Sequence, residues 1–329
     1  MNKYFNRREF IIKTALGGFA FAYGFNKSLF ALPLNKSISS NLTTKIALHK
    51  TSNRKVGVQT VMDLIEYPSM KDKHVIVKPN FNTSDPAPAS THNDTLSQLI
   101  SEIKDRNASE ITLAERSYQP FDEVISEKGI KKMAEELEFK IQNLDLDEYT
   151  LFKGDGLHWK NGFRVPNIIN NAEYIVTTCC LKTHFKGVIT MSLKLSVGIL
   201  PKMHMRELHS SQYINSMIAE INLAYQPKLI VMDGVKTFIS GGPSKGTVAD
   251  GNVVLAGTDR VALDVVGTAI LIDLGTDKIK RGHIFELEQI RRAVELGIGI
   301  DNPDKIEFVT TNDESQEYAE KIKEILMDG

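Results

Sequence analysis

A sequence of 329 residues is long enough for one large α/β domain or two modest ones with a substantial core. Its 42% hydrophobic and 25% charged residues are typical of a globular protein, and the formal net charge of −1 gives no electrostatic reason to expect a nucleic-acid partner. No uninterrupted apolar run reaches about 18 residues, which excludes a conventional multi-span membrane protein.

The first segment, residues 1–31, carries the most specific signal. Paired Arg7 and Arg8 stand ahead of an apolar run that starts at Phe10 and continues as a Gly/Ala-rich stretch. This pattern resembles a twin-arginine export signal; the alternative is an amphipathic first helix. We expect a periplasmic protein that is a partner of the twin-arginine translocation machinery. No clean cleavage pattern occurs near Ala31, so an uncleaved signal that holds the chain at the membrane stays open.

Export in the folded state raises the expectation of a bound cofactor without identifying one. The only two cysteines, Cys179 and Cys180, are adjacent, and neighbouring residues of a strand point to opposite faces. A shared metal site is therefore awkward, and we expect two buried thiols that act as small hydrophobic groups. A strained vicinal disulfide is the alternative. Two thiols cannot supply the usual four ligands of an iron–sulfur cluster, so none is expected.

Residues 32–42 are rich in Ser and Asn and predict a linker, after which strand and helix patterns alternate through residue 311. The first half predicts, in order, a strand at 45–50, a helix at 55–65, a strand at 74–80, a helix at 93–107, a strand at 110–115, a helix at 121–138 and a strand at 140–147. The Gly-Asp-Gly and Asn-Gly turn signals within residues 150–167 predict a small hairpin insertion.

The second half continues the alternation. It predicts a strand at 174–181, a helix at 209–226, strands at 228–234 and 252–257, helices at 259–275 and 284–297, and a strand at 305–310. The apolar run at 174–181 is typical of a strand buried on both faces. We therefore predict one α/β domain over residues 43–311, with a mostly parallel sheet and helices on both faces, and a C-terminal helix over 312–329.

Polar side chains gather where several predicted strands end. In open parallel sheets, ligands bind at the carboxyl ends of strands, where the loops converge. The residues at these ends are Lys78 and Asn80, then Glu115, Arg116 and Ser117, then Lys182, Thr183 and His184, then Asp233, and finally Thr258 and Asp259. Together they predict a pocket at this edge of the sheet.

Six blocks of the sequence carry a family resemblance. They are HVIVKPNFN, THNDTL, CLKTHFKGVITMSLKLSVGILP, LIVMDGV, GGPSKG and AGTDRVALDVV, spread over roughly residues 55–300. In this order they resemble the DUF362 family, a family of undefined function, so the resemblance implies a domain and not a reaction. Some relatives carry a ferredoxin-like segment with Cys-x-x-Cys-x-x-Cys repeats, which this sequence does not contain. The familiar Lys-Asn pair is altered here, because Leu195 follows Lys194.

The stretch around Lys182 and His184 is the centre of the predicted site. Two residues apart on a strand, these side chains project to the same side. A helix that begins near Phe185 would turn its free N–H groups and the positive end of its dipole to that side as well, which favours a carboxylate or phosphate. Lys194 returns to this pocket only if the helix is broken. The alternative is a solvated Lys182 and a His184 that caps a carbonyl.

Two further features have open interpretations. The Gly-rich stretch at 240–247 is either a lid over an anion, contributing Gly241, Gly242 and Lys245, or a plain loop between two strands. His184, His204 and His209 have poor spacing for a shared metal, and no metal site is expected. In the helix at 259–275, Asp259 is the expected N-cap, and Asp264 stands out because its neighbours are apolar.

The sequence as a whole therefore predicts an exported protein that binds an anionic small molecule or cofactor of unassigned identity. Lys182, His184 and Lys194 would supply charge and proton transfer, with His184 near its ordinary pKa of ~6.5 as an acid–base group. The predicted ligand-binding residues are Lys78, Asn80, Glu115, Thr183, Asp233, Gly241, Gly242 and Lys245. The alternative is a non-enzymatic periplasmic accessory or binding protein that works with a separate redox partner carrying an iron–sulfur cluster.

Overall fold

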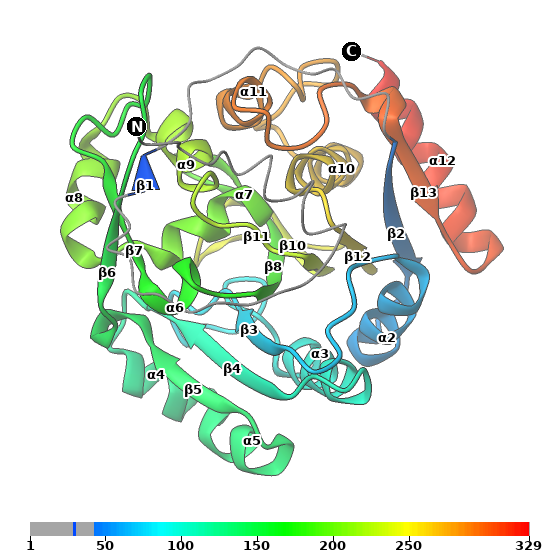
Figure 1. Cartoon of the computed structure of the whole chain (residues 1–329). Helices are drawn as coiled ribbons and strands as arrows, with labels where there is room; N and C mark the ends of the chain where they lie inside the picture. The colour runs from blue at the N-terminus through cyan, green and yellow to red at the C-terminus, as the bar shows by residue number, and fades with distance from the viewer. Residues whose placement is uncertain (1–28, 31–42, 329) are drawn as a thin grey trace, which may run out of the picture.

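The computed structural model describes residues 29–30 and 43–328. The predicted linker and almost all of the predicted export signal lie outside these residues. The described chain confirms the α/β class, with helices on both faces of one large sheet (Figure 1). None of the helices in this part of the chain is long and apolar enough to span a membrane.

The main sheet is mostly parallel, as predicted. Its principal strands are β2 (Thr44–Lys50), β3 (His74–Lys78), β4 (Glu110–Glu115), β5 (Lys140–Asn143), β8 (Tyr174–His184), β10 (Leu229–Gly241), β12 (Val253–Gly257) and β13 (Ile306–Val309). They lie in the order β13-β2-β12-β10-β8-β3-β4-β5. Neighbours are parallel except at β12, which runs antiparallel to both β10 and β2. The carboxyl ends of β3, β4 and β8 therefore meet at one edge.

Helices cover both faces of the sheet (Figure 1). Alternating side chains of the strands pack into two core clusters, one under each helical layer. The helices of one layer are α2 (Arg54–Leu64), α3 (Asn93–Asp105), α4 (Phe121–Glu127) and α5 (Ile130–Leu137), and those of the other are α9 (Ile214–Ile221), α10 (Arg260–Asp273), α11 (Glu288–Glu295) and α12 (Asp313–Met327). In β10, Val231 packs in the first layer and Met232 in the second. A strand with apolar residues on both faces is buried between layers, which explains the apolar runs of the central strands.

Two predicted helices differ in extent from the observed ones. The helix expected over 121–138 breaks into α4 and α5 at Gly129, whose φ of 66° is a left-handed conformation that glycine adopts without strain. The helix expected over 209–226 is α9, preceded by α8 (Lys202–Ser210). Apolar periodicity marks these stretches as helical but does not fix where the chain turns.

The helix expected to begin near Phe185 does not form there, and that expectation was wrong. The chain instead turns back after β8 into β9 (Val188–Thr190), which pairs antiparallel with the end of β8. All three residues of β9 are β-branched and favour a strand. A short helix, α7 (Ser192–Leu195), and a 3₁₀ turn over Ser196–Ile199 follow.

The ends of β10 and β12 also differ from the expectation. Asp233 is not at a strand end, because β10 continues for eight residues beyond it, with a register irregularity relative to β8 between Asp233 and Phe238. Since β12 is antiparallel, Thr258 and Asp259 after it lie at the opposite edge of the sheet from the ends of β3, β4 and β8. Asp259 accepts a hydrogen bond from Ala262 N and caps α10, as predicted.

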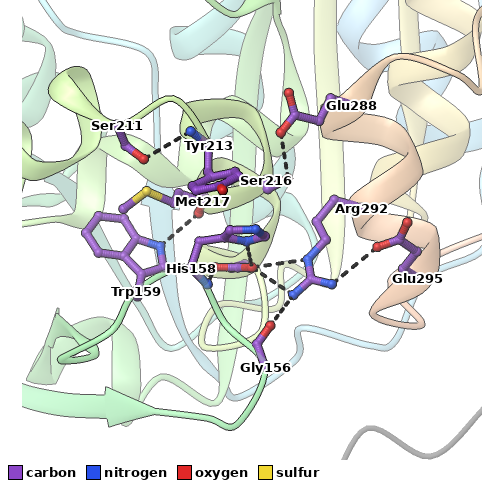
Figure 2. Close-up of polar contacts among 11 residues, drawn as sticks. Gly156, His158, Trp159, Ser211, Tyr213, Ser216, Met217, Glu288, Arg292 and Glu295 are labelled. Atoms are coloured by element: carbon purple, nitrogen blue, oxygen red, sulfur yellow. Dashed lines mark hydrogen bonds and ion pairs between the residues drawn. The ribbon is translucent and has the colours of Figure 1, made fainter.

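The predicted hairpin insertion forms from β6 (Tyr149–Lys153) and β7 (Phe163–Pro166), an antiparallel pair with β1 (Leu29–Phe30) beside β6. Its connecting loop is fastened to α9 and α11 (Figure 2). Glu220 of α9 is fully buried and accepts hydrogen bonds from the backbone N–H and Nδ1 of His158 and from Arg292 of α11. Beside it, Trp159 is buried and donates to the carbonyl oxygen of Met217.

Candidate functional site

A cavity of about 350 Å³ lies at the edge where β3, β4 and β8 end. Its walls come from these strand ends, the β8–β9 hairpin, the segment that contains α7, α8, and the turn after β10. The cavity brings together all three residues predicted to be catalytic and three of those predicted to bind the ligand, namely Lys182, His184, Lys194, Lys78, Asn80 and Glu115.

A buried ion pair holds the ends of β3 and β4 together beneath the cavity. Lys78 Nζ is 2.7 Å from both carboxylate oxygens of Glu115, and the backbone N–H groups of Phe81 and Arg116 donate to the same carboxylate. Burial lowers the pKa of Lys78, and the negative charge of Glu115 opposes that shift. Gly198 covers the pair so closely that a Cβ there would lie 2.6 Å from Lys78 Nζ. These two charges therefore neutralise each other.

Lys182 is buried and not solvated, which overturns the alternative of a solvent-exposed side chain. Its ammonium group donates to Asn80 Oδ1 at 3.0 Å, to the carbonyl oxygen of Ala89 at 2.5 Å and to that of Pro243 at 3.2 Å. These neutral oxygens satisfy all three protons and leave the charge uncompensated. Burial lowers the pKa of Lys182, as it does for any cation taken out of water.

His184 holds the turn between β8 and β9. Its Nδ1 accepts the backbone N–H groups of Lys186 at 3.0 Å and Gly187 at 2.9 Å, so the ring carries its proton on Nε2. His184 therefore accepts hydrogen bonds from two backbone amides, whereas the alternative expected it to cap a carbonyl. Burial and the positive charges of Lys194 and Lys182 lower the pKa of His184 to about 2. His184 is a neutral hydrogen-bond donor, and its expected role as an acid–base group near neutral pH was wrong.

Lys194 reaches the cavity because the hairpin and the shortness of α7 turn the chain back toward the strand ends. Asp264 of α10 fixes this segment by accepting the backbone N–H groups of Ser192 at 2.8 Å and Leu193 at 3.0 Å. Gly187 packs against the side chain, since a Cβ there would lie 3.1 Å from Lys194 Cε. Burial and the neighbouring charge of Lys182 lower the pKa of Lys194 to about 8.

The cavity walls carry an excess of positive charge. Lys78 is paired with Glu115, and Arg116 has Asp145 at 3.3 Å. Lys182 and Lys194, by contrast, have no carboxylate within ion-pair distance in the described part of the chain. Two uncompensated cations in one small cavity favour the binding of an anion.

An unsatisfied hydrogen-bonding group adds to this preference. The hydroxyl of Thr190 is buried in the wall and has no hydrogen-bond partner among the described residues. Buried polar groups are normally paired, so this hydroxyl is available to a ligand. A hydroxyl can donate, as an anion requires.

Two other residues that were predicted to bind the ligand are buried away from the cavity. Thr183 points to the other side of β8 and donates to the carbonyl oxygen of Phe238. Asp233 lies on the α2/α3 side of the sheet, where it accepts hydrogen bonds from Arg54 Nε at 2.8 Å and from the hydroxyl of Thr95 at 2.7 Å. These contacts give both residues structural roles.

The Gly-rich stretch is the tight turn of a hairpin between β10 and β11 (Gly246–Asp250), which agrees with a plain loop between two strands. Gly241 and Gly242 have positive φ values of 77° and 72°, which make the turn possible. Lys245 is exposed and does not line the cavity, whereas Pro243 does. The stretch thus contributes backbone to the wall and no charge.

Several wall residues were not among the predicted ligand-binding residues. Tyr118 and Phe185 are aromatic and exposed, at 80% and 68%, and line the same cavity. The strand-end rule had named Arg116, which directly follows β4, and Tyr118 lies two residues beyond Arg116. Thr190 gave no signal, because its segment was taken for a helix.

Histidines and cysteines form no metal centre in the described residues, which contain no group of three or more His, Cys, Asp or Glu side chains with suitable placement. His204 Nε2 accepts from the backbone N–H of Arg164, and His209 Nδ1 contacts the carbonyl oxygen of Met205. Cys179 and Cys180 are buried and not joined to each other, and burial raises the pKa of both thiols. They are inert hydrophobic groups, as predicted.

Comparison with known proteins agrees with the motifs in the sequence. Residues 75–269, more than half of the chain, match the model of a family described as "Domain of unknown function (DUF362)". The chain belongs to this family. No curated protein matches the sequence.

Among solved structures, the fold is similar to that of a lactate racemase apoprotein from Thermoanaerobacterium thermosaccharolyticum, with 12% sequence identity and a TM-score of 0.43. The match covers 67% of this chain and 54% of that one, so the chain spans about half the length of that protein.

Proposed function

We propose that this DUF362 protein binds a small organic anion in the cavity at the carboxyl ends of β3, β4 and β8. The observation that carries the proposal is the pair Lys182 and Lys194, two cations in one cavity with no carboxylate beside them in the described chain. Of these two, Lys194 has unused N–H groups and would contact the anion, while Lys182 would contribute charge. The hydroxyl of Thr190 offers a further donor.

The size and rim of the cavity bear on the ligand. A volume of about 350 Å³ suits a small molecule and not a polymer. Tyr118 and Phe185 give the wall an apolar part, so an organic anion with an apolar or planar portion fits better than a bare inorganic ion.

The experiment measures the affinity of the purified protein for glycolate, succinate, benzoate and inorganic phosphate by calorimetry. Replacing Lys194 by Met removes a charge-assisted contact, which is worth roughly 1.5–3 kcal/mol, so the affinity for the best of these anions falls roughly 10- to 150-fold. Lys194→Arg, which keeps the charge, retains most of the affinity. Lys186→Met, at an exposed position of the same hairpin that does not line the cavity, leaves it unchanged.

Equal affinities in Lys194→Met and Lys186→Met, with both variants folded by their thermal midpoints, would refute the anion site. So would a failure of all four anions to bind. Binding in the proposed site also weakens as the salt concentration rises, because an electrostatic contribution is screened.

We further propose that the protein is exported through the twin-arginine pathway. Support comes from the pair Arg7 and Arg8 ahead of the apolar run that begins at Phe10. The pathway carries folded cargo, which is compatible with a ligand that is bound before export.

A further inference from the structure

We propose that Lys194 is an amine nucleophile that forms an imine with a small carboxylate carrying an aldehyde or ketone group. The inference rests on the proposed anion site and goes beyond it by naming the reacting atom and the class of substrate. It is drawn from the way in which Lys194 differs from the other cations of the cavity.

The first difference is in its contacts. Lys78 is bound by Glu115, Lys182 donates all three of its protons to neutral oxygens, and Arg116 lies beside Asp145. Lys194 Nζ makes no hydrogen bond and no ion pair with any described residue, although it lines the cavity. Loss of its proton therefore breaks no native contact, and the lone pair of the neutral amine is free to react.

The second difference is in the electrostatic surroundings. A lysine amine is a nucleophile only when neutral, and burial beside another cation is the arrangement that makes it so. Burial, together with the charge of Lys182 in the same cavity, lowers the pKa of Lys194 from 10.5 to about 8. At pH 7 roughly a tenth of the amine is then neutral, about 300-fold more than for an ordinary lysine.

The walls indicate which carbonyl compounds fit. The charge of Lys182 attracts a carboxylate, and a substrate that carries both a carboxylate and a carbonyl group is held with its carbonyl carbon near the amine. Neutral donors are present for the oxygen atom of the carbonyl: the hydroxyl of Thr190 has no partner in the described chain, and His184 carries a proton on Nε2. The cavity is thus suited to addition at a carbonyl of a small organic acid.

The reaction is balanced without a further reactant. The lone pair of Lys194 Nζ forms a bond to the carbonyl carbon while the π electrons move to oxygen, which takes up a proton and becomes a hydroxyl group. The hydroxyl then leaves as water, the nitrogen loses its protons, and a carbon–nitrogen double bond forms. One carbonyl compound and one amine thus give one imine and one water, with no oxidation or reduction.

The experiment traps the imine. The full chain is incubated at pH 7 with glyoxylate, which has an aldehyde beside its carboxylate, and treated with borohydride. Mass spectrometry of the intact chain and of its peptides then counts and locates the reduced adducts. We expect one adduct per chain, at Lys194. Lys194→Arg, which keeps the charge, shows none, and Lys186→Met is labelled as fast as the wild type.

A second measurement follows the reactivity of the amine without relying on anion binding. The rate at which Lys194 is acetylated by acetic anhydride, a neutral reagent, is recorded against pH by peptide mapping. In the wild type the rate at Lys194 reaches half of its maximum at a pH below the ordinary lysine pKa of ~10.4. In Lys182→Met, which removes the neighbouring charge, the midpoint for Lys194 moves to higher pH, and trapping of glyoxylate at pH 7 falls with it.

The outcomes separate this inference from the proposed function. Glyoxylate adducts spread evenly over exposed lysines, or a midpoint at Lys194 equal to the ordinary lysine pKa of ~10.4, would overturn the imine. Glycolate, which has the carboxylate but no carbonyl, serves as the comparison. Glycolate binding that depends on Lys194, without any glyoxylate adduct, would overturn the imine and leave the anion site standing.

Discussion

Replacing Arg292 by Ala tests whether the β6–β7 insertion is held to the core by a buried charge. Arg292 lies on α11, and it reaches toward His158 and Gly156 of the insertion (Figure 2). Its Nε and Nη2 donate to Glu220 at 3.1 and 2.8 Å, and Glu220 has no exposed surface. The substitution therefore leaves a fully buried carboxylate with only the donors of His158, at 2.9 and 2.7 Å.

The expected loss of stability in Arg292→Ala follows from the burial of Glu220. Removal of one partner from a buried ion pair costs roughly 3–5 kcal/mol, because the remaining charge is uncompensated. In a chain of this length, 1 kcal/mol corresponds to about 2 °C, so the thermal midpoint falls by roughly 6–10 °C. The free energy of unfolding, from denaturant titrations, gives the same quantity directly.

The neighbouring Arg291 provides the matched control. It is on the same helix, its side chain is 62% exposed, and its only ion pair within the described chain is with Glu295 at 3.8 Å. Arg291→Ala changes the free energy of unfolding by no more than about 0.5 kcal/mol. The reasoning would be refuted if Arg292→Ala cost no more than Arg291→Ala.

Two further predictions concern Asp264 and the N-terminus. Burial raises the pKa of Asp264 to about 7 from 3.8, so the folded chain keeps this proton at pH values where the unfolded chain has lost it. The contribution of Asp264 to stability is therefore present at low pH and lost as the pH rises through about 7. Because Asp264→Asn cannot ionise, its free energy of unfolding should improve relative to that of the wild type between about pH 5 and about pH 8. A constant difference between the two proteins over this range would contradict the assignment. Changing Arg7 and Arg8 to Lys should leave the protein in the cytoplasm, as cell fractionation would show, and unchanged periplasmic yield would refute the export signal.

The architecture was predictable because its signals are local. The run Tyr174–Leu181 reads as a strand buried on both faces, and the structure places it at the centre of the sheet, between β10 and β3. The hairpin insertion was signalled by its turn residues. By contrast, the β8–β9 hairpin has Phe185, Lys186 and Gly187 at its turn, without the Asn-Gly or Asp-Gly pair that marks the commonest hairpins. Its existence depends on His184 accepting two backbone amides, a contact that no sequence pattern displays.

The position of the cavity was predictable, but the state of its groups was not. The strand-end rule depends on strand direction, and Lys78, Glu115 and Lys182, which it selected, line the cavity. It selected Asp233 wrongly, since β10 continues past that residue. Protonation states depend on burial and on charges brought together from distant parts of the chain, so the low pKa of His184 was beyond the reach of spacing arguments.

The two lysines of the cavity also bear on why the site exists. A core that needed only stability would pair each buried cation with a carboxylate, as the same cavity does for Lys78 with Glu115. Lys182 and Lys194 are instead left as like charges in one small space. Burial, together with this repulsion, lowers the pKa of Lys194. An anion bound as proposed would remove this repulsion, and part of its binding energy would be relief of a cost that is already present in the fold. Departures from electrostatic balance of this kind gather at functional sites, and this is the physical ground for proposing that Lys194 binds an anion and reacts as an amine.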